Sequence, residues 1–255
     1  MVKILRQFRC GRLVFVVIYT SPAAGDSAKA RAQKKKASTE ARERLNARTS
    51  FQKLERTLAD NFDNGDLFVT ITFDNKHLPE TRDQSINRVR SFLAKLRAAR
   101  KARGQPLRYI YVVEGCRPGG RPHIHIVINS TGEDLEELQK LWRYGDIDMR
   151  RLTFDREYTY EDLASYMTKE PREWGHPHVG ERTWVPSLGL VKSEPETVQV
   201  PDMLTLTAPT EAIVVSKDGP HTNGYGEWCW MKYLLPYDPG RPRQRAKRKQ
   251  RKKKE

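Results

Sequence analysis

Two histidines, His123 and His125, are separated by a single residue in the run His-Ile-His-Ile-Val-Ile. Side chains alternate between the two faces of a β-strand, so a strand here places both imidazoles on one face and Ile124, Ile126 and Ile128 on the other. Two imidazoles at this separation can bind one divalent ion together. A bare His-x-His pair is also an ordinary part of many sheets, so a metal site needs a further ligand.

Glu114 is the candidate for that ligand. It stands nine positions before His123, and the Pro- and Gly-rich turn at residues 117–122 predicts a hairpin between them. Closing the hairpin brings the carboxylate back against His123 and His125. Two imidazoles and one carboxylate suit Mg²⁺ or Mn²⁺ and leave positions for phosphate oxygens, although zinc would also accept them. The sequence therefore predicts a divalent metal site.

A second reactive pair is Tyr166 and Lys169, three positions apart in a segment predicted to be helical. Positions i and i+3 share a helix face, so the ammonium can lie near the hydroxyl and near a phosphate that the hydroxyl attacks. A tyrosine with its ordinary pKa of about 10 is a poor nucleophile. A neighbouring cation and a metal-bound phosphate are the means available to activate it. Taken alone, this spacing is a weak signal.

The middle of the chain predicts the elements that position these residues. Segments rich in β-branched and aromatic residues predict strands at 67–73, 107–114, 123–129 and 146–154. Segments with apolar residues at helical spacing predict helices at 83–103, 133–144 and 160–169. This order predicts an α+β fold, in which a central antiparallel β-sheet is packed with helices.

The net charge of +15 is concentrated towards the two ends of the chain. Residues 29–56 hold ten basic and three acidic residues, and residues 241–255 hold ten basic and one acidic residue. These tracts account for the whole excess, so the middle is near neutral and typical of a folded domain with basic arms. Such arms are often solvated tails, but two of them beside a phosphate-binding centre favour contact with nucleic acid.

Composition divides the chain into four parts. Residues 1–60 are predicted as short strands and a basic helical arm, and residues 61–175 as the domain that carries the reactive residues. Residues 176–240 are an extension of unknown role, and residues 241–255 a disordered basic tail. Three widely spaced cysteines indicate no disulfide framework, and no early apolar run approaches the ~20 residues of a membrane helix. We expect a cytoplasmic protein with no membrane partner.

Three motifs in this order resemble those of HUH endonucleases, the His-hydrophobe-His nucleases of rolling-circle replication proteins in phages, plasmids and small single-stranded DNA viruses. They are Phe-Val-Thr-Ile-Thr-Phe at 68–73, Glu114 with Pro-His-Ile-His-Ile-Val-Ile at 122–128, and Tyr-Met-Thr-Lys at 166–169. The resemblance covers roughly residues 61–175 and is nearest to initiators of bacterial phages, plasmids or integrative elements.

The resemblance implies an RRM/ferredoxin-like sheet with the metal site at its centre and the tyrosine helix lying over it. His123 and His125 match the metal ligands, Glu114 the acidic ligand, Tyr166 the nucleophile and Lys169 its companion. The family reaction is attack of the tyrosine on a scissile phosphate, which gives a 5′-phosphotyrosine link and a free 3′-hydroxyl primer. The reverse reaction rejoins strands.

The implied substrate is single-stranded DNA at a replication origin in a bacterial host. A one-tyrosine mechanism is expected, because the second tyrosine of two-tyrosine relatives lies four positions away, where this chain has Asp162. The sequence lacks a Gly-x-x-x-x-Gly-Lys-Ser/Thr phosphate loop, so a host helicase and polymerase are expected partners. The arginines expected to contact DNA are Arg117 and Arg121 beside the metal hairpin, and Arg97 and Arg100 on the helix at 83–103.

Two kinds of alternative stay open. A single-tyrosine transposase or a relaxase would use the same chemistry, although relaxase sites use three histidines. A non-enzymatic nucleic-acid-binding protein would keep His123 and His125 as structural residues. Binding without chemistry predicts an affinity that falls with salt, but no strand cleavage and no metal dependence.

Overall fold

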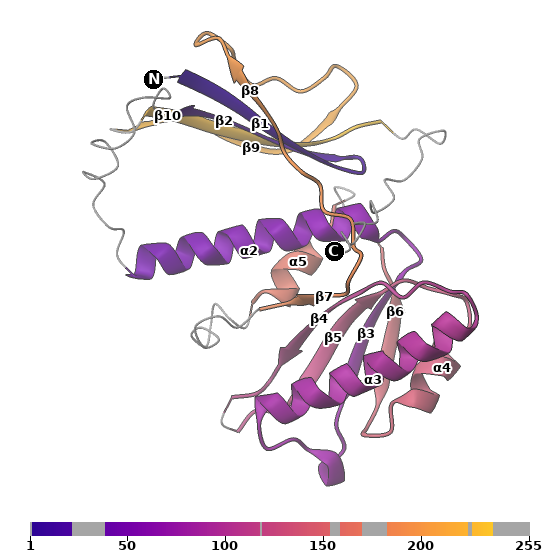
Figure 1. Ribbon diagram of the computed structural model, residues 1–255. Coiled ribbons are helices and arrows are strands. Elements are labelled where there is room, and N and C mark those ends of the chain that lie inside the picture. The colour runs from indigo at the N-terminus through magenta and orange to yellow at the C-terminus, as the bar shows by residue number, and fades with distance from the viewer. Residues whose placement is uncertain are drawn as a thin grey trace, which may run out of the picture.

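The computed structural model describes residues 2–21, 39–117, 119–153, 159–169, 183–223 and 226–236. These residues form two five-stranded antiparallel sheets and four α-helices, so the predicted α+β class is confirmed. Figure 1 shows one sheet on either side of the long helix α2 (Thr39–Asn61), with α3 (Arg82–Ala102) and α4 (Asp134–Leu141) on the far side of the lower sheet. No helix among the described residues is long and apolar enough to cross a membrane.

The lower sheet, called the central sheet below, has the strand order β6-β3-β5-β4-β7. Its strands are β3 (Leu67–Thr72), β4 (Tyr109–Glu114), β5 (His123–Ile128), β6 (Ile147–Arg151) and β7 (Val185–Pro186). A short 3-10 helix, η1 (Asn75–His77), follows β3. β4 and β5 form the predicted hairpin, whose register pairs Glu114 with His123 and Val112 with His125.

Strand alternation gives the central sheet two different faces. One face packs against α3 and α4 through an apolar core that includes Val69, Ile71, Leu96, Ile124 and Ile126. The other packs against α2 and the short helix α5 (Glu161–Met167), through a core that includes Leu54, Leu58, Val127, Ala164 and Met167. Since His123 and His125 alternate with the isoleucines, they lie on the face that α5 covers.

The upper sheet, called the terminal sheet below, has the order β8-β1-β2-β10-β9. Its strands are β1 (Val2–Cys10), β2 (Leu13–Ser21), β8 (Glu196–Val200), β9 (Ile213–Asn223) and β10 (Gly226–Leu234). β1 pairs with β8, and β2 pairs with β10. One sheet thus joins residues from the predicted N-terminal part and the predicted extension, which cuts across the division expected from composition.

Helix α2 connects the two sheets. Leu54 and Leu58 are fully buried in the core of the central sheet. On the opposite side of α2, the Arg56 guanidinium lies 3.8 Å from the ring centroid of Phe8 in the terminal sheet. The second half of this predicted basic arm is therefore part of the core. The first half of the arm, residues 22–38, and the predicted tail at 241–255 lie outside the described residues.

Candidate metal centre and tyrosine site

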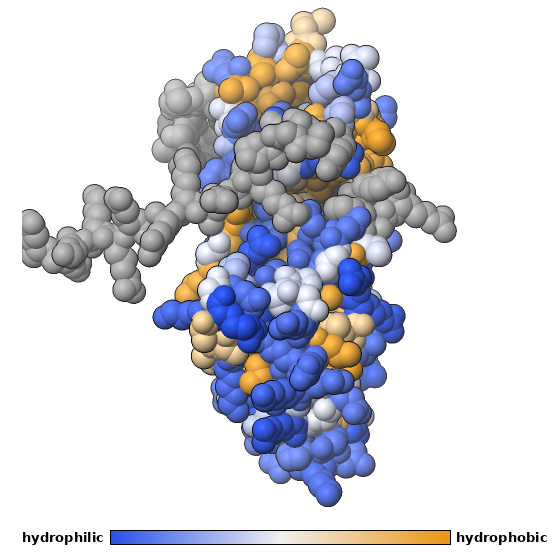
Figure 2. Space-filling view, turned by 90° about the vertical axis from the view of Figure 1, so that its right-hand side faces the viewer, coloured by the Kyte–Doolittle hydropathy of each residue, from blue (hydrophilic) through white to orange (hydrophobic). Residues whose placement is uncertain are grey.

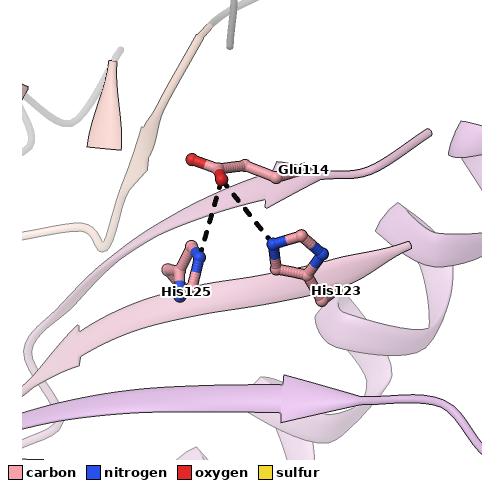
Figure 3. Close-up of side chains that lie close together, drawn as sticks. All are labelled: Glu114, His123 and His125. Carbon is pink, nitrogen blue, oxygen red and sulfur yellow. Dashed lines mark ion pairs between the residues drawn. The ribbon is translucent and has the colours of Figure 1, made fainter. Parts of the chain in front are cut away.

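The hairpin β4-β5 brings the three predicted metal ligands together. The Nε2 atoms of His123 and His125 each lie 3.6 Å from Oε2 of Glu114. Figure 3 shows Glu114 reaching from β4 over the two imidazoles, which project from neighbouring positions on β5. One ligand atom from each residue lies within 4.8 Å of the others, close enough for all three side chains to hold one ion.

Hydrogen bonds from neighbouring groups orient both imidazoles. Nδ1 of His123 lies 3.0 Å from the carbonyl oxygen of Arg121. A carbonyl only accepts, so this nitrogen donates and Nε2 keeps its lone pair for an ion. Nδ1 of His125 lies 3.0 Å from the Thr70 hydroxyl on β3, which can accept from it in the same way. Phe68 stacks on the His125 ring, with the ring centroids 5.3 Å apart.

The turn that closes the hairpin needs a glycine at position 115. Gly115 has a φ of +73°, in the left-handed region that residues with a Cβ rarely adopt. A Cβ there would lie 2.2 Å from the Arg121 carbonyl oxygen and 3.0 Å from Nδ1 of His123. Any side chain at this position would therefore displace the carbonyl that orients His123.

Glu114 is only 4% exposed, and it is ionised. Burial alone would raise the pKa of this carboxyl, but the His123 and His125 imidazoles and the Lys169 charge outweigh it and lower the pKa to about 2. Its buried Oε1 accepts no hydrogen bond from the described residues. An ionised, buried carboxylate with an unused oxygen beside two imidazole nitrogens fits a divalent cation.

Helix α5 places Tyr166 against the metal centre. The Tyr166 hydroxyl lies 3.2 Å from Nε2 of His125, and its ring meets the Phe68 ring edge-on at 6.2 Å. The residue is 41% exposed, so the hydroxyl reaches the site while the side chain stays accessible from outside. Tyr160 is 1% exposed and packs in the core, and Tyr158 lies outside the described residues.

Lys169 lies directly after the last turn of α5. Its ammonium is 3.7 Å from the centroid of the Tyr166 ring and 3.8 Å from Oε2 of Glu114. The Thr168 hydroxyl donates to the Ala164 carbonyl at 2.8 Å and holds this end of the helix. The cation is thus shared between the tyrosine and the carboxylate, as the i and i+3 spacing predicts.

Three of the four arginines expected to contact DNA are exposed. Arg121 donates to Asn75 at 2.8 Å and also to the Phe73 carbonyl, so it ties the hairpin to the end of β3. Arg117 lies on the same hairpin. Arg97 donates to the Tyr109 hydroxyl at 2.8 Å, on the helix that covers the sheet face opposite the metal centre. Contact of these side chains with DNA remains a prediction.

The prediction that Arg100 contacts DNA is wrong, because this residue is completely buried. Its guanidinium donates to Asp134 at 2.7 Å, to Glu137 at 3.1 Å and to the Asn129 carbonyl at 2.8 Å. The sequence carried a signal for burial, since Arg100 follows Leu96 by four positions and so continues the apolar stripe of α3. A basic residue on a helix was assigned to the solvent side without this check.

Sequence reasoning also gave no role to Thr70 and Phe68, the two β3 residues that contact His125. The alternation in β3 placed them on one face, but only the pairing of β3 with β5 puts Thr70 opposite His125. The signal was therefore local for the face and non-local for the contact.

Residues 66–171 match a family of replication-associated proteins, the ORF2 type. The matched stretch runs from the start of β3 past α5 and contains Glu114, His123, His125, Tyr166 and Lys169. No curated protein and no solved structure matches the chain. The match supports a replication-associated role for the part of the chain that holds the site.

Proposed function

We propose that this protein is a metal-dependent, single-tyrosine endonuclease that nicks single-stranded DNA at a replication origin and initiates rolling-circle replication. The observation that carries the proposal is the Tyr166 hydroxyl, 3.2 Å from Nε2 of His125 in a three-ligand centre. A tyrosine in a purely structural sheet has no reason to meet two histidines and a buried carboxylate. The similarity to replication-associated proteins supports the link to replication.

Glu114, His123 and His125 would hold Mg²⁺ or Mn²⁺, which supplies Lewis acidity and positive charge to the scissile phosphate. The Nε2 lone pair of His125 can accept from Tyr166 or serve an ion, but not both. Loading the centre therefore frees the hydroxyl to turn to the substrate. The low pKa of Glu114, about 2, keeps this carboxylate ionised at neutral pH.

In the proposed reaction, the Tyr166 oxygen attacks the phosphorus of the scissile phosphodiester. The new O–P bond forms as the bond from phosphorus to the 3′ oxygen breaks; the tyrosine loses its proton and the leaving 3′ oxygen gains one. The products are a 5′-phosphotyrosine and a 3′-hydroxyl that primes synthesis. Lys169, held beside Tyr166 and Glu114, neutralises negative charge that develops on the phosphate. The reverse attack by a 3′-hydroxyl rejoins strands.

The proposal extends to the surroundings of the reaction. Arg117 and Arg121, on the hairpin that carries the ligands, are proposed to bind phosphates flanking the cut. Unwinding and extension of the primer are assigned to a helicase and a polymerase of a bacterial host, in its cytoplasm. A transposase would use the same side chains, and a relaxase fits less well because the centre pairs two histidines with a glutamate.

The test is covalent capture of DNA. The protein is mixed with labelled single-stranded oligonucleotides that tile the DNA of its genetic element, with Mn²⁺ and with or without a chelator, and run on a denaturing gel. We expect a protein-linked band that needs both metal and Tyr166. Tyr166→Phe keeps the ring contacts with Phe68 and His125 but removes the hydroxyl, so it should bind DNA and form no band.

Tyr144→Phe is the matched control, because Tyr144 is a partly exposed tyrosine packed against Trp142 instead of the metal centre. It should form the band as the wild type does. Salt-sensitive DNA binding with no band on any oligonucleotide would reject the nuclease and favour a binding protein. Joined products in place of a free 3′-hydroxyl primer would favour transposition.

A further inference from the structure

A buried lysine of the terminal sheet contacts the helix that carries the tyrosine. Lys232 on β10 is 3% exposed, and its ammonium donates to Oε1 of Glu55 on α2 at 3.0 Å. The same ammonium pairs with Oε2 of Glu161, in the first turn of α5. Burial alone would lower the pKa of Lys232, but the two carboxylates outweigh it and raise the pKa, so the group is charged. One cation therefore joins β10, α2 and α5.

Helix α5 depends on such external contacts. It has seven residues, and no side chain caps its first turn at Tyr160. A helix of this length is not stable by itself in water. Ala164 and Met167 pack its apolar side into the core beside α2. The second attachment is the Glu161 carboxylate, which is held by Lys232.

The two ends of α5 face different partners. Glu161 and Tyr166 are five positions apart, which turns their side chains by roughly 140° about the helix axis. Glu161 meets the terminal sheet through Lys232, while Tyr166 meets His125 in the central sheet. A pair at the first residue of the helix therefore restrains rotation of the residue that carries the hydroxyl.

We infer that Lys232 is a positioning residue for Tyr166, and that the terminal sheet serves the reaction by fixing the first turn of α5. The inference rests on the proposed function, since it concerns how the nucleophile is oriented. Small displacements of a reacting group cost large factors in rate, up to about 100-fold for 1 Å. The terminal sheet is thus a working part of the site even though none of its described residues touches the metal ligands.

The test separates orientation from binding. Glu161→Gln removes the charge that faces Lys232 but leaves the buried pair between Lys232 and Glu55, so the fold is retained. Asp162→Asn is the matched control, because it makes the same charge change in the same helical turn at an exposed position. The readouts are the single-turnover rate of covalent capture at saturating DNA and Mn²⁺, and the Kd for DNA.

We expect Glu161→Gln to lower the capture rate about tenfold or more with an unchanged Kd, and Asp162→Asn to react as the wild type does. Glu161→Lys, which places two cations together, should lower it further. A wild-type rate in Glu161→Gln, or an equal loss in both neutral variants, overturns the inference, because equal losses would reflect only the charge of the first helical turn.

Failure of the proposed function would look different. If the wild type captures no DNA, the nuclease is rejected, and amide hydrogen exchange of α5 decides the positioning role. Faster exchange of α5 amides in Glu161→Gln than in Asp162→Asn supports an anchor at Lys232. Equal exchange in the two variants rejects it.

Discussion

The two sheets of this protein have the same number of strands and the same antiparallel pairing, but they are covered differently. The central sheet has helices on both faces, and all six residues of β4 are buried. Exposed apolar side chains lie instead on or beside the terminal sheet, as the hydrophobic area at the top of Figure 2 shows: Val198, Met203, Leu204, Ile213 and Val214. The reactive residues occur only on the sheet whose surroundings are dense enough to hold them in place.

Each sheet also contributes to a buried ionic cluster, and the two clusters differ in reach. Arg100 binds partners 29 to 37 positions away, all within the central sheet and its helices. Lys232 binds partners 71 and 177 positions away, on the two helices between the sheets. The central part closes on itself, whereas the terminal sheet is tied to the remainder of the protein through the helices beside the site.

The largest expected effect comes from breaking the cluster of the central part. Arg100→Met keeps the apolar stem but leaves Asp134 and Glu137 without their cation. We expect the free energy of unfolding to fall by about 3–5 kcal/mol, because uncompensated buried charges are costly. Urea unfolding measures it. Arg97→Met, at an exposed position of the same helix, should cost less than about 1 kcal/mol, and a similar small cost for Arg100→Met would contradict the closure by Arg100.

The next effect tests whether the covered face of the central sheet orients the metal ligands. Thr70→Val removes the hydroxyl that contacts Nδ1 of His125 but keeps the shape of the side chain. We expect the affinity for Mn²⁺ to fall about 10–100-fold. Thr72→Val is the control, because Thr72 lies on the same face of β3 and bonds only weakly to a loop carbonyl. Calorimetric titration measures both variants, and equal affinities would remove Thr70 from the site.

A smaller effect is expected at the seam between the sheets, where Asp60 on α2 accepts hydrogen bonds from Ser193. Burial raises the pKa of Asp60 from 3.8 to about 6, against the opposing effects of Ser193 and Arg56. The folded state therefore holds the proton more tightly than the unfolded chain. This contribution to stability is complete below about pH 4 and is lost as the pH rises through about 6.

We expect Asp60→Asn to remove a decline of roughly 1–3 kcal/mol in the free energy of unfolding between pH 4 and pH 7. Urea unfolding at several pH values follows this decline. Asp202→Asn, at an exposed aspartate beside the terminal sheet, should keep the wild-type pH dependence. If Asp60→Asn kept it as well, the seam would not be the origin of the decline.

The smallest effect is expected at the edge of the central sheet. Arg150 on β6 pairs with Asp148 at 3.1 Å, but both side chains are exposed to solvent. Arg150→Ala should change the free energy of unfolding by less than about 0.5 kcal/mol, since water screens such pairs. Comparison with Arg100→Met in the same urea series isolates the contribution of burial. A loss above about 1 kcal/mol would show that exposure does not separate the two arginines.

Local patterns were sufficient for most of the central part. Strand alternation and helical spacing predicted β3 to β6 and α3 to α5 to within three residues at every boundary. They also placed Glu114, His123 and His125 on one hairpin, because its register follows from the turn and the alternation. Arg100 was misassigned because its partners lie on other elements, and spacing alone does not reveal a buried cation.

The sequence by itself determined the α+β class, the metal ligands brought together by β4 and β5, and the tyrosine and lysine on one helix. Only the tertiary structure decided that β1 and β2 pair with β8 and β10, and that Lys232 reaches Glu161. The physical reason is range. Periodicity and turn residues act over a few positions, whereas pairing of strands some 200 residues apart depends on how all the elements pack together.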